Sequence, residues 1–452
     1  MSRLDRTEVD RLILDSAQQA NVLPITSGCD SRCVFCSHKN NPPGVRVAWI
    51  GRRSPADVAR TLAFLRADHV ITIGESATPI IEGEPFTHPE LSAILALVRR
   101  AFPDTPVEIT TNGRFLGQEA VRMLEAVGNV ALNVSLNSAS VRGRRLLMGE
   151  GAEEAARAIA GIELLGRSSL LFAGSLVAMP NLVGWEDLRD TVSYLAANGA
   201  AAVRVIVPAY SALADRSLFP DDSILARTPE FVAGMSVDSP CPVLIEPSYV
   251  SDLWPEASGV LKESPAWKAG VRPGDVVSQI NGRKPRSRVE AWQMLLRAGH
   301  VAADIARGGR DLPMEWINPA EGGSGVTFEY DFDPARMEAV GRTVAGREGR
   351  SLLLSSELGH SAVTCVLQML GLGPEAAEAV AVRSLTFGGT IRAAGLLTVG
   401  DYLAAYVAWR RANAEPGQIL TPVESFNSLG FDLTHRHVSE LERLTGRPVV
   451  LV

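Results

Sequence analysis

The sequence predicts an α/β fold for residues 1–210, a partial (β/α)6 barrel. Six short runs are rich in aliphatic and β-branched residues, as strands buried in a parallel sheet are. They cover residues 22–26, 69–74, 107–111, 130–136, 170–178 and 203–208. Amphipathic stretches of helical period separate these runs. Strands that alternate with helices in this way form parallel sheets with the helices packed outside.

The helix after the first run has a recognisable start. Ser54 is a good N-cap residue and Pro55 suits the first helical position, so we expect a helix from there to Arg66. The remaining amphipathic stretches are residues 89–101, 118–127, 152–165 and 185–198. In a TIM-like barrel the functional residues lie at the carboxyl ends of the strands. We therefore expect them directly after the strand-like runs.

Three further segments follow the predicted barrel. Residues 211–244 carry scattered Pro, Ser and Asp with weak periodicity, which is typical of a connection. Residues 245–317 contain repeated glycine turns and are expected to form a second domain. Residues 318–452 are expected to form a C-terminal α/β domain.

Composition argues against several classes of protein. The formal net charge of −7 disfavours a general nucleic-acid binder, and the basic run Arg142–Arg145 is expected on a solvated helix face. No stretch of about eighteen uncharged apolar residues is present, so no membrane span is expected. The charged N-terminus lacks the apolar core of a signal peptide, which favours a cytoplasmic location.

Three cysteines follow the first strand-like run directly. Cys29, Cys33 and Cys36 have the spacing CxxxCxxC. Three thiolates on one loop suit an iron–sulfur cluster that keeps one coordination position open, and open positions are where metal sites do chemistry. Zinc would require a fourth ligand, and His38 does not give a usual zinc-finger spacing. Five cysteines in 452 residues do not make a disulfide framework.

This motif, with the aromatic residue Phe35 just before the last cysteine, resembles that of the radical S-adenosylmethionine (radical SAM) superfamily. The resemblance implies an enzyme in which Cys29, Cys33 and Cys36 hold a [4Fe–4S] cluster and S-adenosyl-L-methionine binds the fourth iron. It implies a 5′-deoxyadenosyl radical that abstracts hydrogen from an unidentified small molecule or peptide. An electron donor such as flavodoxin or ferredoxin is implied as well, and no catalytic residue beyond the cluster ligands is assigned.

The family places a Gly-Gly-Glu-Pro-like segment after its second strand, where it meets the methionine amine. Two segments of this chain are candidates, eight residues apart. The first is Gly74, Glu75 and Ser76, at the strand end; the second contains Glu84 and Pro85. The position at the strand end favours Glu75, and the residues that lead into the next helix favour Glu84, so both stay open.

Other cofactor positions follow from the same resemblance. Asn112 ends the third run, where a turn is the plain alternative. Ser135 and Asn137 end the fourth run on one side and would face the ribose; capping of the next helix is the alternative. Met179 follows the fifth run and Val207 lies within the sixth; both would meet adenine, although apolar residues there would be buried in any case.

The second domain resembles a PDZ domain of the bacterial protease-associated kind, which is β-rich. The matching segments are 264–266, 269–270, 272–275 and 280–282. The resemblance implies a possible protein partner, because PDZ domains add a peptide strand to a sheet edge. The glycine-rich carboxylate loop is expected before Ser258, but residues 249–255 lack that pattern. An architectural role is therefore equally open.

The C-terminal segment resembles the uncharacterised domain of a family that combines a radical SAM barrel with a PDZ-like domain. The match lies in residues 357–372, 387–398 and 441–449. Cys241 and Cys365 stand alone and are expected to be small buried hydrophobes.

Three functions remain open at this stage: hydrogen abstraction by the deoxyadenosyl radical, group transfer of a methyl or 3-amino-3-carboxypropyl group, and a non-catalytic cluster and PDZ scaffold. The reaction would make the enzyme an oxidoreductase or a transferase, and the sequence does not name its substrate.

Overall fold

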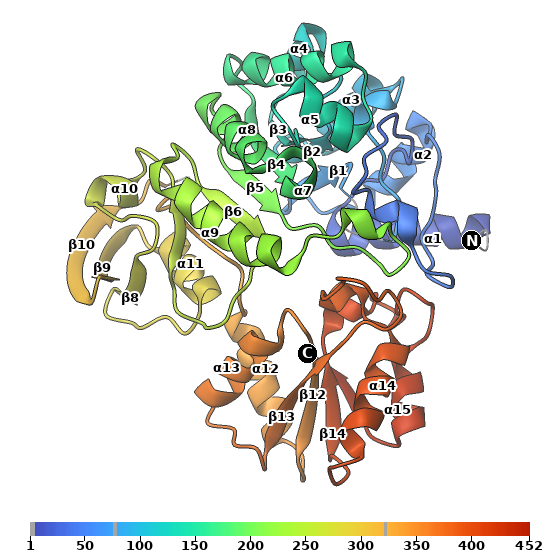
Figure 1. The fold of residues 1–452 in the computed structure, drawn as a ribbon, viewed down its shortest axis with the longest axis vertical. Coiled ribbons are helices and arrows are strands. Elements are labelled where there is room, and N and C mark those ends of the chain that lie inside the picture. The colour runs from blue at the N-terminus through green and yellow to red at the C-terminus, as the bar shows by residue number, and fades with distance from the viewer. Residues whose placement is uncertain (1–4, 76–78, 321–322) are drawn as a thin grey trace. The chain divides into compact units, whose positions relative to one another are not determined.

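The computed structural model describes residues 5–75, 79–320 and 323–452 (Figure 1). The chain divides into two compact units, each of which is described by itself. The first contains Met1–Pro208 and Asp215–Met235, and the second contains Ala209–Ala214 and Ser236–Val452. No helix in the described ranges has the length and apolar character needed to cross a membrane.

A parallel sheet organises the first unit. Neighbouring strands follow one another in sequence order, β1 to β5, and β6 comes next in the strand order of the sheet. The strands are β1 (Ile71–Ile73), β2 (Val107–Thr111), β3 (Val130–Ser135), β4 (Leu171–Val177), β5 (Val203–Ile206) and β6 (Val243–Glu246), the last of which belongs to the residues of the second unit. This is the topology of the predicted partial barrel, and the predicted α/β class is confirmed.

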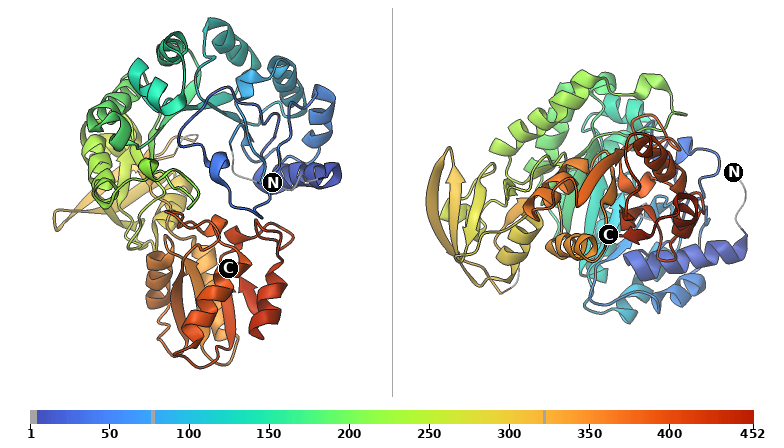
Figure 2. Two further views of the ribbon diagram at one scale, coloured as in Figure 1. Left: turned by 45° about the vertical axis from the view of Figure 1, so that its right-hand side comes forward. Right: turned by 90° about the horizontal axis from the view of Figure 1, so that it is seen from below.

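The sheet is curved, and helices that connect its strands lie on its outer side (Figures 1 and 2). The helices of this part of the chain have the following bounds. They are α1 (Arg6–Ala20), α2 (Pro55–Leu62), α3 (Leu91–Ala101), α4 (Gln118–Val127), α5 (Val141–Met148), α6 (Ala152–Gly166), α7 (Pro180–Val183), α8 (Trp185–Ala197) and α9 (Asp222–Asp238). Ser54 caps α2 by accepting a hydrogen bond from the Asp57 N–H, as predicted. Short 3₁₀ turns occur at Ser37–Asn40 and Pro85–Thr87.

The prediction of the first strand was wrong. Residues 22–26 make isolated bridges only, Val22 with Thr72 and Thr26 with Arg52. Pro24 has no N–H to donate, so a ladder cannot continue through this segment. The sixth strand of the sheet is instead β6, which crosses the boundary between the predicted connection (211–244) and the predicted second domain (245–317).

Two small antiparallel sheets follow in the second unit. One has the order β10-β9-β8 and the other pairs β11 with β7. The elements are β7 (Ala257–Val260), α10 (Pro265–Ala269), β8 (Val276–Ile280), α11 (Arg288–Arg297), β9 (His300–Arg307), β10 (Arg310–Ile317) and β11 (Val326–Phe328). Their apolar residues form one core, which includes Val277, Leu295 and Trp316.

The rest of the chain forms a parallel sheet of order β13-β12-β14-β15. Its elements are α12 (Pro334–Ala345), β12 (Ser351–Ser356), α13 (His360–Met369), β13 (Ala377–Val382), α14 (Val399–Arg410), β14 (Gln418–Thr421), α15 (Val438–Thr445) and β15 (Val449–Leu451). Separate apolar clusters, one with Leu354 and Tyr402 and one with Leu353 and Val340, pack on its two faces.

A buried carboxylate fixes the loop between β13 and α14. Asp401 is 1% exposed, and its Oδ1 accepts hydrogen bonds from the backbone N–H groups of Leu385 and Thr386, both at 2.9 Å. Its Oδ2 accepts from the Thr398 N–H at 2.9 Å, which closes the capping box of α14. One side chain therefore satisfies donors at both ends of the loop.

We predict that Asp401→Ala lowers the free energy of unfolding by about 3 kcal/mol, because several buried donors lose their acceptor. Denaturant unfolding followed by circular dichroism measures this change. The exposed Asp311→Ala is the matched control and should leave the midpoint unchanged. Equal midpoints for the two variants would contradict this role of Asp401.

Candidate functional site

The three cysteine side chains lie close enough to act on one another. Cys29 is exposed on its loop, Cys33 and Cys36 are half-buried, and all three are free thiols. Burial raises the pKa of Cys33 to about 12, and the charges of Cys29 and Cys36 raise it further while Lys39 and Arg144 lower it. As thiolates the three would repel one another, so they suit a group that brings positive charge.

The donor set fits an iron–sulfur cluster. Thiolates are the protein ligands of [4Fe–4S] clusters, and in a cluster each thiolate binds its own iron. Among the described residues no three His, Cys, Asp or Glu side chains are placed to close on a single metal ion. Three thiols on one loop supply the ligand type that a cluster needs, one for each of three irons.

The base of the cysteine loop is clamped to the segment that contains Glu84. The Gly28 carbonyl accepts hydrogen bonds from the Glu84 N–H at 2.8 Å and from the Thr87 hydroxyl at 3.2 Å. The Gly83 N–H donates to the Thr26 carbonyl at 2.8 Å. A Cβ on Gly83 would lie 2.1 Å from the Gly28 oxygen, so only glycine allows the two backbones to meet.

The middle of the loop is held by the end of α5. The N–H groups of Arg32 and Val34 donate to the carbonyls of Met148 and Leu147, each at 2.8 Å. Gly149 ends this helix with a left-handed φ of +66°. Carbonyls at a helix C-terminus have no partner within the helix, and here the cysteine loop supplies two donors.

A buried arginine stabilises the contact between α5 and the cysteine loop. Arg144 is 0% exposed; its Nε and Nη2 donate to the two carboxylate oxygens of Glu150 at 2.8 and 2.7 Å. Its Nη1 donates to the Leu136 carbonyl at 2.6 Å, and Nη2 also donates to the Asn112 carbonyl at 3.0 Å. Arg144 thus ties the ends of β2 and β3 to the helix that holds the cysteine loop.

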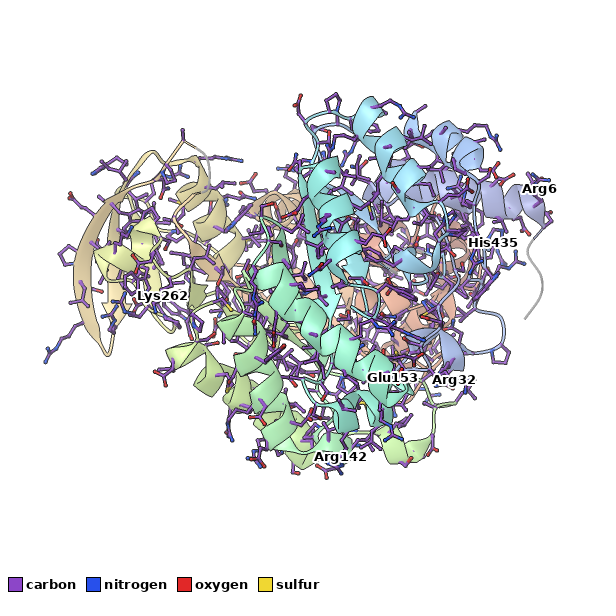
Figure 3. The ribbon with its side chains drawn as sticks, turned by 90° about the horizontal axis from the view of Figure 1, so that it is seen from above. Arg6, Arg32, Arg142, Glu153, Lys262 and His435 are labelled. Atoms are coloured by element: carbon purple, nitrogen blue, oxygen red, sulfur yellow. The ribbon has the colours of Figure 1, made fainter. Side chains whose placement is uncertain are left out.

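The expectation that residues 142–145 form a solvated face was wrong at Arg144. The neighbouring Arg142 does lie at the surface (Figure 3). Four consecutive residues of a helix point to different sides, so they cannot all be exposed. The sequence pattern does not distinguish an arginine that is buried with an acidic partner from one that is exposed. Glu150, six residues later, was the only available indication in the sequence.

Glu84 lies between the end of β2 and the base of the cysteine loop. It is 3% exposed, and burial raises its pKa to about 7, while its hydrogen bonds act in the opposite direction. Its carboxylate accepts from the Asn112 N–H at 2.7 Å, the Thr111 hydroxyl at 2.8 Å and the Phe86 N–H at 3.2 Å. Its charge also acts on Cys29.

The two candidate acidic segments therefore lie in different surroundings. Pro85 is buried beside Gly74, where a Cβ on the glycine would lie 2.5 Å from the proline ring. Glu75 is half-buried and acts on Glu108 of β2 rather than on a cysteine. Ser76 lies outside the described residues. Among the described residues, hydrogen bonds join the Glu84 segment to the cysteine loop, and which of Glu75 and Glu84 meets the methionine amine stays a prediction.

The remaining predicted cofactor residues differ in how many hydrogen bonds their side chains already make. The amide of Asn137 donates to the Ser135 carbonyl at 2.9 Å and accepts from the Val177 N–H at 3.0 Å, and the residue is 2% exposed with φ +62°. Ser135 is half-buried, and its hydroxyl is 3.1 Å from that of Ser175. Asn112 donates to the Ser31 hydroxyl of the cysteine loop at 3.0 Å.

Met179 and Val207, at 0% and 7% exposed, follow the ends of β4 and β5, and Phe35 is half-buried within the cysteine loop. Met179 and Val207 are buried, and burial alone explains why they are apolar, without any role in cofactor binding. Their part in adenine binding stays a prediction.

One ion-pair bridge was not anticipated from the sequence. Arg114 contacts Asp30, which lies between Cys29 and Cys33, at 2.8 Å and also pairs with Glu154 of α6. The bridge gives the cysteine loop a further attachment, to α6.

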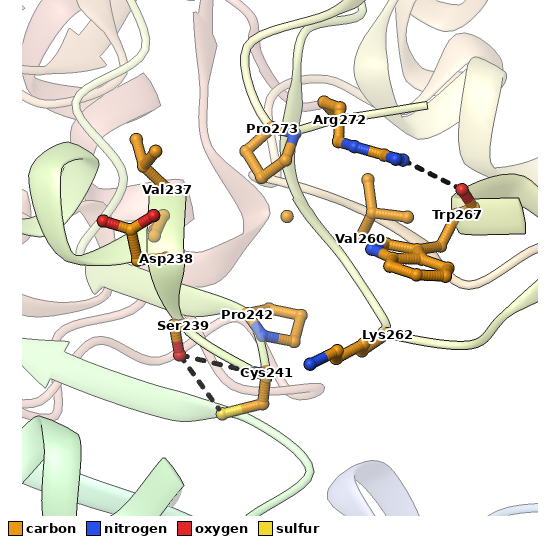
Figure 4. A pocket seen from close by; sticks show the side chains of 12 residues that line it. Val237, Asp238, Ser239, Cys241, Pro242, Val260, Lys262, Trp267, Arg272 and Pro273 are labelled. Atoms are coloured by element: carbon orange, nitrogen blue, oxygen red, sulfur yellow. Dashed lines mark hydrogen bonds between the residues drawn. The ribbon is translucent and has the colours of Figure 1, made fainter. Parts of the chain in front are cut away.

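The two other cysteines lie in the second unit. Cys241 is 5% exposed, at a pocket of about 250 Å³ formed with Lys262, Trp267 and Arg272, and its sulfur is 3.8 Å from the Ser239 hydroxyl (Figure 4). Cys365 is half-buried and donates to the Ser251 carbonyl at 3.6 Å.

Comparison with known proteins gives two family matches. Residues 23–195 match the radical SAM superfamily, and residues 256–306 match a PDZ domain. The chain therefore contains a radical SAM domain near its N-terminus, followed by a PDZ domain. It is an enzyme of the class that uses a [4Fe–4S] cluster and S-adenosyl-L-methionine, and these matches leave its reaction open.

Similar curated proteins are GTP 3′,8-cyclases. That of Paenarthrobacter nicotinovorans is 29% identical over 116 residues, 26% of this chain and 31% of the relative. A probable GTP 3′,8-cyclase of Halobacterium salinarum is 27% identical over 186 residues, 40% of this chain and 48% of the relative. The matched segments thus span less than half of these relatives. SuiB of Streptococcus suis, bound to the precursor peptide SuiA, is a solved structure with TM-score 0.40 and 17% identity, over 50% of this chain and 48% of that chain.

We predict that Arg144→Gln lowers the free energy of unfolding by about 3 kcal/mol or more, since Glu150 would keep a buried charge without its partner. The variant should also retain less iron after anaerobic reconstitution, because α5 would no longer hold the cysteine loop. The exposed Arg145→Gln on the same helix is the control. Wild-type stability and iron content in Arg144→Gln would rule this support out.

Proposed function

We propose that this enzyme cleaves S-adenosyl-L-methionine reductively and abstracts a hydrogen atom from its substrate. When bound at Cys29, Cys33 and Cys36, a [4Fe–4S] cluster supplies the electron that converts S-adenosyl-L-methionine to methionine and a 5′-deoxyadenosyl radical. The observation that carries the proposal is the loop of three mutually close thiols at the strand ends, held against buried Glu84. A reducing compartment such as the cytoplasm would keep these thiols free.

The residues around the loop would bind and orient the cofactor. Since both oxygens of Glu84 already accept hydrogen bonds, we propose that it shapes the strand ends and supplies negative charge toward the methionine amine. Ser135 has a hydroxyl on the side of the strand ends and stays the candidate for the ribose, whereas Asn137 would hold β3 and β4 together. An unidentified substrate and an electron donor such as flavodoxin or ferredoxin complete the reaction.

Two alternative functions are distinguished by products. Group transfer would give 5′-methylthioadenosine or S-adenosylhomocysteine, and a scaffold would give no product. Hydrogen abstraction gives 5′-deoxyadenosine.

We predict that the anaerobically reconstituted chain holds iron and sulfide near four each and, after reduction, forms 5′-deoxyadenosine. Cys33→Ala should lose the cluster and the product together, while Cys365→Ala, outside the motif, should keep both. Mass spectrometry and iron and sulfide analysis measure these outcomes. Zinc as the sole metal, or a cluster in wild-type protein without any nucleoside product, would contradict the proposal.

A second proposal concerns the PDZ domain, which we infer binds an extended peptide. The glycine-rich loop absent before Ser258 occurs instead ahead of β11, where Gly323 and Gly325 have left-handed φ values of +64° and +83°. β11 pairs with β7 on one side and lies at the edge of its two-stranded sheet. Successive backbone N–H groups of such a loop can capture a terminal carboxylate.

The facing helix offers an apolar wall for such a peptide. Trp292 and Leu296 of α11 are four residues apart and 48% and 52% exposed. A Cβ on Gly323 would lie 3.5 Å from the Leu296 side chain, so this helix borders the glycine loop. An added strand would therefore lie between β11 and α11, with its apolar side chains toward α11.

We predict that arrays of peptides with free carboxyl termini and apolar last residues contain binders to the full chain, and that their amidated copies do not bind. Leu296→Lys should weaken binding about tenfold, because it places a charge in the apolar wall. Leu444→Lys, 43% exposed in the C-terminal domain, is the control. Equal binding of free and amidated peptides would exclude carboxylate capture by this loop.

A further inference from the structure

The solvent side of α5 carries basic side chains on one face. Arg142, Arg145 and Gly149 are spaced three and four residues apart, so they lie on the same side of the helix. All three are exposed, and Arg142 is seen at the surface in Figure 3. Arg144 and Leu147, on the other side of the helix, are 0% exposed. The basic run that the sequence singles out therefore presents two of its three arginines to solvent.

The cysteine loop extends this basic face. Arg32 lies between Cys29 and Cys33 in sequence, and its side chain is exposed. A Cβ on Gly149 would lie 3.0 Å from the Arg32 Cβ, so Arg32 borders the end of α5. The Arg32 N–H group donates to the Met148 carbonyl at 2.8 Å, which fixes the position of its backbone. The basic face thus continues from α5 to the proposed cluster ligands.

We call these exposed residues the arginine row: Arg32, Arg142 and Arg145. The charge around the row differs from that of the whole chain, whose formal net charge is −7. Residues 29–53, which include the cysteine loop, hold five basic residues and one acidic residue, a net charge of +4 with histidine neutral. The acidic residue, Asp30, is ion-paired with Arg114. A basic area on an acidic protein attracts acidic partners and repels basic ones.

An apolar side chain lies beside the row. Leu146 follows Arg145 directly on α5 and is 46% exposed. Protein interfaces combine apolar contacts with a polar rim, and arginine is enriched in them. One exposed acid, Glu153 in the first turn of α6, follows the end of α5 (Figure 3), and the three arginines of the row outnumber it. The surface therefore suits a protein partner with a mainly acidic face.

We propose that the arginine row is the docking surface of an acidic one-electron carrier protein. The proposal rests on the proposed function, because it names the surface that receives the electron donor of that reaction. The carrier loses one electron and the cluster held by Cys29, Cys33 and Cys36 gains it, with no bond formed or broken. A carrier on this row lies against the cysteine loop itself, which keeps the path of the electron short.

The test measures how an oxidised flavodoxin and an oxidised [2Fe–2S] ferredoxin, both acidic, bind to the full chain reconstituted anaerobically. Biolayer interferometry at about 0.02 M and about 0.3 M salt reports the affinity. We expect at least one carrier to bind, and to bind more weakly at the higher salt. Arg32→Glu and Arg145→Glu should each weaken binding about tenfold at the lower salt. Arg145→Lys keeps the charge and should bind as the wild type does.

Arg66→Glu is the matched control, because it makes the same change in net charge. Arg66 is exposed and lies between α2 and β1, at the amino edge of the sheet and not at the carboxyl edge. A second readout is the rate at which the reduced carrier bleaches the visible absorbance of the cluster. This rate should fall in Arg32→Glu and Arg145→Glu, whereas dithionite should reduce all variants equally.

Wild-type protein that forms 5′-deoxyadenosine with dithionite but binds neither carrier overturns the proposal. Equal binding by the wild type, Arg32→Glu and Arg145→Glu overturns it as well. A duplex RNA oligonucleotide that displaces the carriers from the row would assign the row to nucleic acid and also overturn it. The proposed function fails separately, when protein reduced with dithionite forms no 5′-deoxyadenosine.

Discussion

The backbone contact between Gly28 and the Gly83–Glu84 peptide is the constraint on which the rest of the site depends. A single carbonyl, that of Gly28, accepts hydrogen bonds from the Glu84 N–H and the Thr87 hydroxyl immediately before the first cysteine. The absence of a Cβ at Gly83 permits this approach. Because Glu84 also binds the end of β2 through Thr111 and Asn112, the contact fixes the loop to the sheet.

A second layer holds the loop from the other side. The C-terminal carbonyls of α5 accept hydrogen bonds from two N–H groups of the loop. Arg144 joins α5 to the ends of two strands, and Arg114 forms an ion pair with Asp30 of the loop. Rigid supports of this kind keep functional side chains in position better than a free loop would. The cysteine thiols themselves stay available as ligands, with Cys29 exposed and the other two half-buried.

Short sequence patterns predicted most strands of the sheet and the position of the cysteine loop. Aliphatic runs located β1 to β5, and the cysteine spacing located the loop, because both signals are local in sequence. The strand at residues 22–26 was wrong because Pro24 interrupts the ladder, and β6 was missed because weak periodicity surrounds it. Arg144 looked like a surface charge, since its partners Glu150, Leu136 and Asn112 come together only in the fold. The glycine-rich carboxylate loop of a PDZ domain was expected before Ser258, and the proposal that residues near Gly325 take this role became possible only once the pairing of β11 with β7 was known.

The central claim is that three thiolates hold a cluster whose fourth iron is open to S-adenosyl-L-methionine. Mössbauer spectra of the chain reconstituted with ⁵⁷Fe test it directly, because each iron reports its own ligands. The account predicts that added S-adenosyl-L-methionine shifts the signal of one iron in four and leaves the other three unchanged. Four irons with the same signal, unaffected by S-adenosyl-L-methionine, would contradict it.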